Sequence, residues 1–170
     1  MVGFISGDIS PPVVLSHDTN HTQLGVVMCG LSQSKPTDDW RRTSLLRTII
    51  MINKVPCKVI LDSGSCINAI SHQTVIKTGL KLVPHPQPLK VSWINTNSLQ
   101  ISDRCLVPIH IAGYEDNIWC DVVNMDVGSI ILGRPWLFDL NVTLYGKSNS
   151  CSFLHKGRKI RINPIQPMSN

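Results

Sequence analysis

The sequence contains no apolar run long enough to span a lipid bilayer, and it does not open with a basic segment followed by a sustained apolar stretch. We therefore expect neither a membrane-spanning helix nor a secretory leader. Six cysteines are present, but no two of them form a Cys-x-x-Cys pair. These absences predict an intracellular, cytoplasmic protein with reduced thiols, several of them buried as small apolar side chains.

Clustered metal ligands are also scarce. His17 and His21 are the only two histidines close together in the sequence, and they lie in a polar segment. A zinc site needs several ligands brought together on a fixed scaffold. We therefore predict no metal site and no cofactor.

The composition is that of one ordinary globular domain. Of the 170 residues, 42% are hydrophobic and 16% are charged, which is typical of folded rather than disordered chains. Eleven prolines and eleven glycines without a repeat favour many turns and short strands over a helix bundle. The formal net charge of +5 permits weak nucleic-acid binding without requiring it.

One stretch joins an apolar strand to an acid and a turn. Val59-Ile60-Leu61 has no polar interruption and reads as a strand buried on both faces. Asp62 follows at once, with Ser63 and Ser65 as hydroxyl donors and Gly64 as the residue that tolerates a sharp turn. The pattern predicts a carboxylate on a braced loop. Asp-Ser-Gly is also common in ordinary turns, so a purely structural turn is the alternative.

A second apolar strand, from about Ser129 to Leu132, ends in Gly133-Arg134-Pro135. Proline at a first helical turn predicts that a short helix starts there. Another helix is predicted over 71–78, with Ser71 as its N-cap and Gly79 as its C-terminal stop.

Together, Ile60-Leu61-Asp62-Ser63-Gly64-Ser65-Cys66 and Ile131-Leu132-Gly133-Arg134-Pro135-Trp136 resemble the motifs of retropepsin-like aspartic proteases. The sequence of these two motifs is most similar to protease domains of plant gypsy-type LTR-retrotransposon polyproteins. The resemblance implies a mainly β fold, a retropepsin-like closed β-barrel with one or two short helices. It divides the chain into a disordered or loosely ordered linker over 1–41, the protease domain over 42–163 and a tail over 164–170.

The resemblance also implies roles for single residues. Asp62 would be the catalytic acid and base, while Ser63, Gly64 and Ser65 would support the loop and the dimer. Residues that would pack behind the loop are Ile131, Leu132, Gly133 and Arg134. The hairpin between the motifs would be the flap over the substrate, formed by Trp93, Ile94, Asn95, Thr96, Asn97, Ser98 and Leu99. Its tip lacks the glycines usual in viral flaps, so a plain surface hairpin is the alternative.

Only one Asp-Ser-Gly loop is present. Peptide hydrolysis by carboxyl groups alone needs two of them, one ionised as the general base and one protonated as the general acid. The consequence is a symmetric homodimer in which the Asp62 side chains of the two copies lie side by side. We therefore predict an aspartic endopeptidase whose partners are a second copy and a polypeptide substrate, which the resemblance suggests is a retroelement polyprotein. A catalytically silent dimerisation or interaction module of the same fold is the alternative.

Two further positions carry predictions. Many viral relatives have an acid where Cys66 stands, and that acid pairs with the arginine of the Gly-Arg segment. A buried unpaired guanidinium would be costly, so Arg134 is predicted to pair elsewhere or to be partly exposed. Asp126-Val127-Gly128-Ser129 lacks a hydroxyl between its acid and glycine and is not counted as a second catalytic motif.

The remaining pattern predicts mostly short strands. They are expected over 46–52, 55–61, 89–94, 99–102, 104–112 and 117–123, and near 142–144, 151–154 and 159–162, with the proline-rich segment 81–88 as an extended loop. Lys156, Arg158, Lys159 and Arg161 form a basic stripe. A solvated strand face explains it most simply, and nucleic-acid contact is the weaker alternative.

Overall fold

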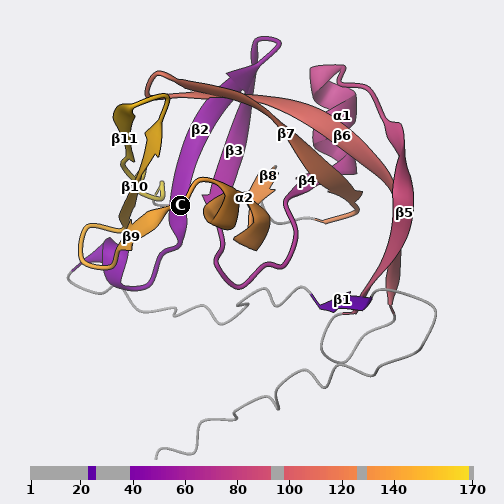
Figure 1. Ribbon diagram of the computed structural model, residues 1–170, viewed down its shortest axis with the longest axis horizontal. Helices are drawn as coiled ribbons and strands as arrows, with labels where there is room; N and C mark the ends of the chain where they lie inside the picture. Colours follow the sequence, from indigo (N-terminus) through magenta and orange to yellow (C-terminus); the bar gives the residue numbers. More distant parts are fainter. Residues whose placement is uncertain (1–22, 26–38, 93–97, 126–129, 169–170) are drawn as a thin grey trace, which may run out of the picture.

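The computed structural model describes residues 23–25, 39–92, 98–125 and 130–168, and within them the protein is mainly β (Figure 1). The elements in chain order are β1 (Gln23–Gly25), η1 (Trp40–Arg42), β2 (Leu46–Ile52), β3 (Val55–Leu61), β4 (Ala69–Ser71), α1 (His72–Thr78), β5 (Val83–Ser92), β6 (Leu99–Ile111), β7 (Tyr114–Val123), β8 (Ile130–Leu132), α2 (Arg134–Asp139), β9 (Thr143–Tyr145), β10 (Ser150–His155) and β11 (Arg158–Ile162). The predicted fold class, mainly β with one or two short helices, is confirmed.

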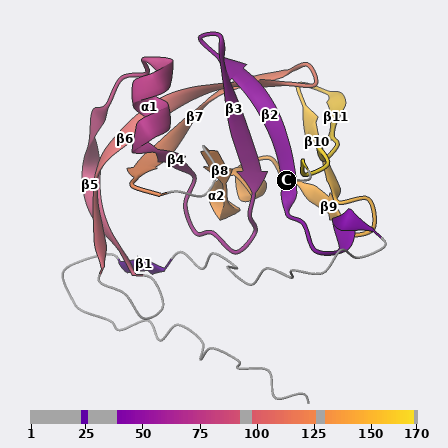
Figure 2. The ribbon, with the colours of Figure 1, turned by 180° about the vertical axis from the view of Figure 1, so that it is seen from behind.

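The described strands form two sheets. The larger one has the order β1-β5-β6-β7-β4-β8-β3-β2, and the smaller one has the order β11-β10-β9. The larger sheet therefore ends in β1 and β2 among the described residues, although it curves strongly around the core. Seen from both sides, the three-stranded sheet lies at one end of the molecule, while β5 and α1 lie at the other (Figures 1 and 2).

The β2–β3 hairpin delivers the acidic loop to its place. Asn53 and Lys54 have φ values of 49° and 67°, the left-handed conformation that a tight two-residue hairpin turn requires. The register runs from Ile52 opposite Val55 to Leu46 opposite Leu61. Because alternate residues of β2 and four of the seven residues of β3 are buried, a one-residue slip would expose this apolar set.

The short strand β8 lies between β3 and β4. It runs parallel to β3, with Leu61 opposite Leu132, and antiparallel to β4. Residues about 70 positions apart in the sequence are thereby placed side by side. The end of β3, where Asp62 follows, comes to lie against the start of α2.

Helix α1 has the predicted ends. The hydroxyl of Ser71 accepts from the backbone N–H of Thr74 at 3.2 Å, which satisfies one of the free donors of the first turn. Gly79 follows the helix with φ of 70°, the left-handed stop that glycine adopts without a steric penalty.

The segment 81–88 was predicted to be a loop, and this is wrong for most of its length. Strand β5 begins at Val83, which lies opposite Arg104, and the register with β6 shifts between Pro84 and Leu89. Prolines are tolerated there because β1 pairs only with the last residues of β5, so no described strand pairs along that edge at the proline positions. Strand β7 likewise starts earlier than predicted, at Tyr114.

The described part of the chain has no helix with the length and apolar character needed to cross a membrane.

Candidate active-site loop

Asp62 stands directly after β3 with its carboxylate held by its own loop. One oxygen, Oδ1, accepts from the backbone N–H of Gly64 at 2.9 Å, and Oδ2 accepts from the hydroxyl of Ser65 at 2.8 Å. The residue is 6% exposed. A carboxylate has roughly four acceptor positions, so about two remain for a water, a substrate or another acid.

The loop is fastened to the β8–α2 junction by backbone hydrogen bonds. The Asp62 N–H donates to the Leu132 carbonyl at 3.0 Å, and the Arg134 N–H donates to the Ser65 carbonyl at 2.8 Å. These bonds tie both ends of the acidic loop to the second motif. The structure thus brings the two sequence motifs together.

Gly133 lies in van der Waals contact with the loop. A Cβ on this residue would overlap the Ile67 carbonyl oxygen and lie 2.7 Å from the Ser65 carbonyl oxygen. Ile131 and Leu132, which are buried beside it, complete the packing behind the loop. The side chain of residue 133 must therefore be absent for the loop to approach this closely.

Asn68 is a site residue that the sequence motifs do not predict. Its side-chain oxygen accepts from the Gly133 N–H at 2.9 Å, and it is 8% exposed. The sequence feature that could have indicated it is a lone polar residue in the apolar run from Ile67 to Ile70. A buried amide needs a hydrogen-bond partner.

The outward side of the loop carries Ser63, Gly64 and Cys66, which are all exposed. The Ser63 hydroxyl has no hydrogen-bond partner among the described residues and can bond to a neighbouring molecule, whereas Ser65 is fully buried against Asp62. Arg134 is exposed, which confirms the prediction that it would avoid unpaired burial.

The tip of the predicted flap, Trp93 to Asn97, lies outside the described residues, as does the segment 126–129. Of the flap residues only Ser98 and Leu99 are described, and both are exposed at the start of β6.

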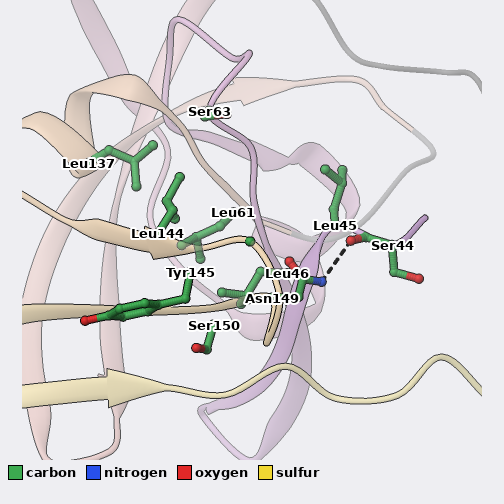
Figure 3. Close-up of a pocket in the computed structure, with 11 residues that line it drawn as sticks. Ser44, Leu45, Leu46, Leu61, Ser63, Leu137, Leu144, Tyr145, Asn149 and Ser150 are labelled. Carbon is green, nitrogen blue, oxygen red and sulfur yellow. Dashed lines mark hydrogen bonds between the residues drawn. The ribbon is translucent and has the colours of Figure 1, made fainter. Parts of the chain in front are cut away.

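A pocket of about 210 Å³ lies beside the loop (Figure 3). It is lined by Leu61 from the end of β3, Ser63 from the loop and Leu137 from α2. Leu144 and Tyr145 line it from β9. The Asn149 amide donates to the Ser44 carbonyl at 2.8 Å and closes one side. Among the described residues, no three His, Cys, Asp or Glu side chains gather in a way that could hold a metal ion.

Residues 58–157, more than half of the chain, match the family model of the PEG10/RTL1 protease domain. The chain belongs to this family. The matched region contains both sequence motifs, that of the acidic loop and that of the β8–α2 junction which supports it. The finer likeness to plant gypsy-type elements stays a prediction.

A solved structure shows the same fold. The retroviral protease-like domain of Ddi1 from Leishmania major is similar with a TM-score of 0.52 and 20% identity, over 69% of this chain and 92% of that one. EIAV protease in complex with the inhibitor HBY-793 matches with a TM-score of 0.42 and 21% identity, over 60% and 93%. No curated protein sequence matches the chain. The predicted retropepsin-like fold is confirmed.

Proposed function

We propose that the protein is an aspartic endopeptidase that acts as a homodimer, with Asp62 of each copy as one half of the catalytic pair. The observation that carries the proposal is the Asp62 carboxylate itself. It follows a buried strand, is oriented by the Gly64 N–H and the Ser65 hydroxyl, and belongs to a loop with an exposed outer side.

The chemistry follows from pairing two such loops. Two carboxyl groups held roughly 3 Å apart cannot both ionise, so they share one proton, as in aspartic proteases generally. The ionised group then takes a proton from the attacking water while the protonated group polarises the scissile carbonyl. The backbone bonds from the loop to Leu132 and Arg134 would keep each carboxylate in a fixed orientation.

Strand β9 supports the dimer. It pairs with β10 along one edge, and no other described strand pairs along its second edge. Free strand edges are templates for pairing with another chain. Leu144 and Tyr145 of this strand line the same pocket as Ser63, so a second copy that paired here would approach the acidic loop.

The substrate would be an extended polypeptide bound between the acidic loop and the β5–β6 hairpin, and a retroelement polyprotein inside the cell fits this role. The family match to a protease domain supports a polypeptide substrate.

A silent module of the same fold is the second candidate. It is favoured by one observation: both oxygens of Asp62 already accept hydrogen bonds within their own loop, and the residue is almost buried. A purely structural turn would have the same bonds.

Digestion of an unfolded protein substrate between about pH 4 and 7 separates the candidates. We expect cleavage by the wild type and a loss of roughly a hundredfold to ten-thousandfold in Asp62→Asn. Asp139→Asn, which removes an exposed acid from α2, is the matched control and should cleave normally.

Mixing the two chains tests the shared site. With nine parts of Asp62→Asn to one part of wild type, random pairing leaves about one wild-type chain in ten with a wild-type partner. The rate per wild-type chain should therefore fall about tenfold. An unchanged rate would exclude a site shared between copies, and a wild type that sediments as a dimer without cleaving any substrate would establish the silent module.

A further inference from the structure

The basic residues of the chain are concentrated near its C-terminal sheet. Residues 139–163 hold five of the 16 lysines and arginines but only one of the 11 acids. The four members of the basic stripe, Lys156, Arg158, Lys159 and Arg161, are all exposed. None of them forms an ion pair with a carboxylate of the described residues. This end of the molecule therefore has an uncompensated positive charge.

The register of the three-stranded sheet sorts these residues onto two faces. One face packs into the core and carries Cys151, Phe153, Ile160 and Ile162. We call the opposite side the outer face, which is formed by Thr143, Tyr145, Ser150, Ser152, Leu154, Lys159 and Arg161. It combines the exposed Thr143, the buried Ser150 and Ser152, one aromatic ring and two cations.

Arg161 is held in place by neutral partners. Its guanidinium donates to the hydroxyls of Ser150 at 2.9 Å and Ser148 at 3.4 Å, and to the Asn163 side-chain oxygen at 3.3 Å. Its central carbon lies 5.0 Å from the centre of the Tyr145 ring. The cation is thus fixed beside an aromatic ring without a counter-charge, an arrangement suited to an incoming anion.

A groove of about 500 Å³ runs along the outer face. Tyr145, Ser152 and Lys159 line it from the sheet, and Asp139 lines it from the end of α2. The Tyr145 and Ser152 hydroxyls lie 2.9 Å apart and share a hydrogen bond. The groove is within the size range of small-molecule sites, so it can hold a nucleotide unit.

We propose that the outer face binds single-stranded nucleic acid. Lys159 and Arg161 would contact phosphates, a base would stack on the Tyr145 ring within the groove, and Asp139 would accept a hydrogen bond from a sugar hydroxyl or a base amino group. Stacking on a sheet aromatic flanked by cations is how many proteins hold single strands. Leu154 is the large exposed apolar side chain of this face, which is too little for insertion into a membrane surface.

The test is fluorescence anisotropy of the full chain with labelled 20-nucleotide oligo(U) and oligo(dT) over a series of salt concentrations. We expect binding that weakens with salt and a slope of log affinity against log salt that falls by about one in Lys159→Gln. Tyr145→Ala should weaken binding roughly fivefold or more, since it removes a stacking platform, while Tyr145→Phe should bind nearly normally.

Matched controls keep the test decisive. Lys58→Gln and Lys77→Gln each remove an exposed lysine from a distant element and should leave binding and its salt slope almost unchanged. Asp62→Asn should bind normally, which separates this site from the proposed catalytic loop.

Three results would overturn the proposal. One is an equal effect of the stripe and control variants. Another is equally tight binding of duplex DNA, heparin, an acidic peptide or anionic vesicles, because these lack splayed bases. The third is normal binding by a folded Tyr145→Ala.

Discussion

Replacing Gly133 by alanine tests whether the loop support is as tight as the structure shows. The residue has φ of −102°, so alanine would meet no backbone strain, and the whole effect would come from its methyl group. That group would overlap the Ile67 carbonyl oxygen and lie 2.7 Å from the Ser65 carbonyl oxygen. Both obstacles are backbone atoms, which cannot swing aside as a flexible side chain can.

The size of the effect follows from what must move. Overpacking of this kind costs about 1–3 kcal/mol. Displacing the loop also weakens the bonds from Gly133 to Asn68 and from Arg134 to Ser65, each worth about 1 kcal/mol. We expect a loss of about 3 kcal/mol in the free energy of unfolding, a large share of the roughly 5–15 kcal/mol of a typical domain.

Urea unfolding measures this loss. With a slope of about 2 kcal/mol per molar urea, the midpoint should fall by about 1.5 M. Gly146→Ala is the matched control, because its Cβ would meet nothing within 4 Å and its φ is not positive. If Gly133→Ala unfolded within about 0.5 kcal/mol of the wild type, as the control should, the close packing behind the loop would be refuted.

Two further predictions concern titratable groups. Cys66 is exposed, whereas the other four described cysteines are buried and burial raises the pKa of their thiols, that of Cys151 to about 11. Iodoacetamide should therefore label Cys66 well before those four at about pH 8, and comparable labelling of Cys151 in peptide mass spectra would contradict this. Burial also raises the pKa of the Asp121 carboxyl, against the opposing effect of His85 at 3.1 Å. The folded chain then keeps this proton to a higher pH than the unfolded chain, so the contribution of Asp121 to stability falls as pH rises above roughly 4. Asp121→Asn should gain stability relative to the wild type over that rise, and a constant difference in urea unfolding across pH would show otherwise.

Local sequence patterns predicted those parts of the fold that depend mainly on residues close together in the sequence. The β2–β3 hairpin needed only alternating apolar residues and two turn residues, Asn53 and Lys54. Helix α1 was marked at both ends by Ser71 and Gly79. In each case the information lies within about ten residues, where pattern and turn chemistry suffice.

Features that depend on distant partners were not predictable in this way. The hydrogen bond from the Gly133 N–H to the Asn68 side-chain oxygen joins residues 65 positions apart, and no local pattern predicts it. The same holds for the Tyr114 hydroxyl, which accepts a hydrogen bond from the Trp136 indole N–H at 3.3 Å and donates one to Asp116. The bond to Trp136 fixes α2 to β7. The prolines of β5 led to the wrong prediction of a loop for a related reason. Only the tertiary arrangement shows that no described strand pairs along that edge at the proline positions.

The parallel pairing of β3 with β8 also sets an order of events during synthesis. The pairs β2–β3, β6–β7 and β10–β11 join neighbours in the chain and can close as soon as each hairpin is made. The loop at Asp62 must wait for residues up to Arg134 to leave the ribosome, because Leu132 and Gly133 complete its bonds. A nascent chain that stops short of β8 would thus carry the acid without the framework that orients it, and any cutting would be postponed until the whole domain is made.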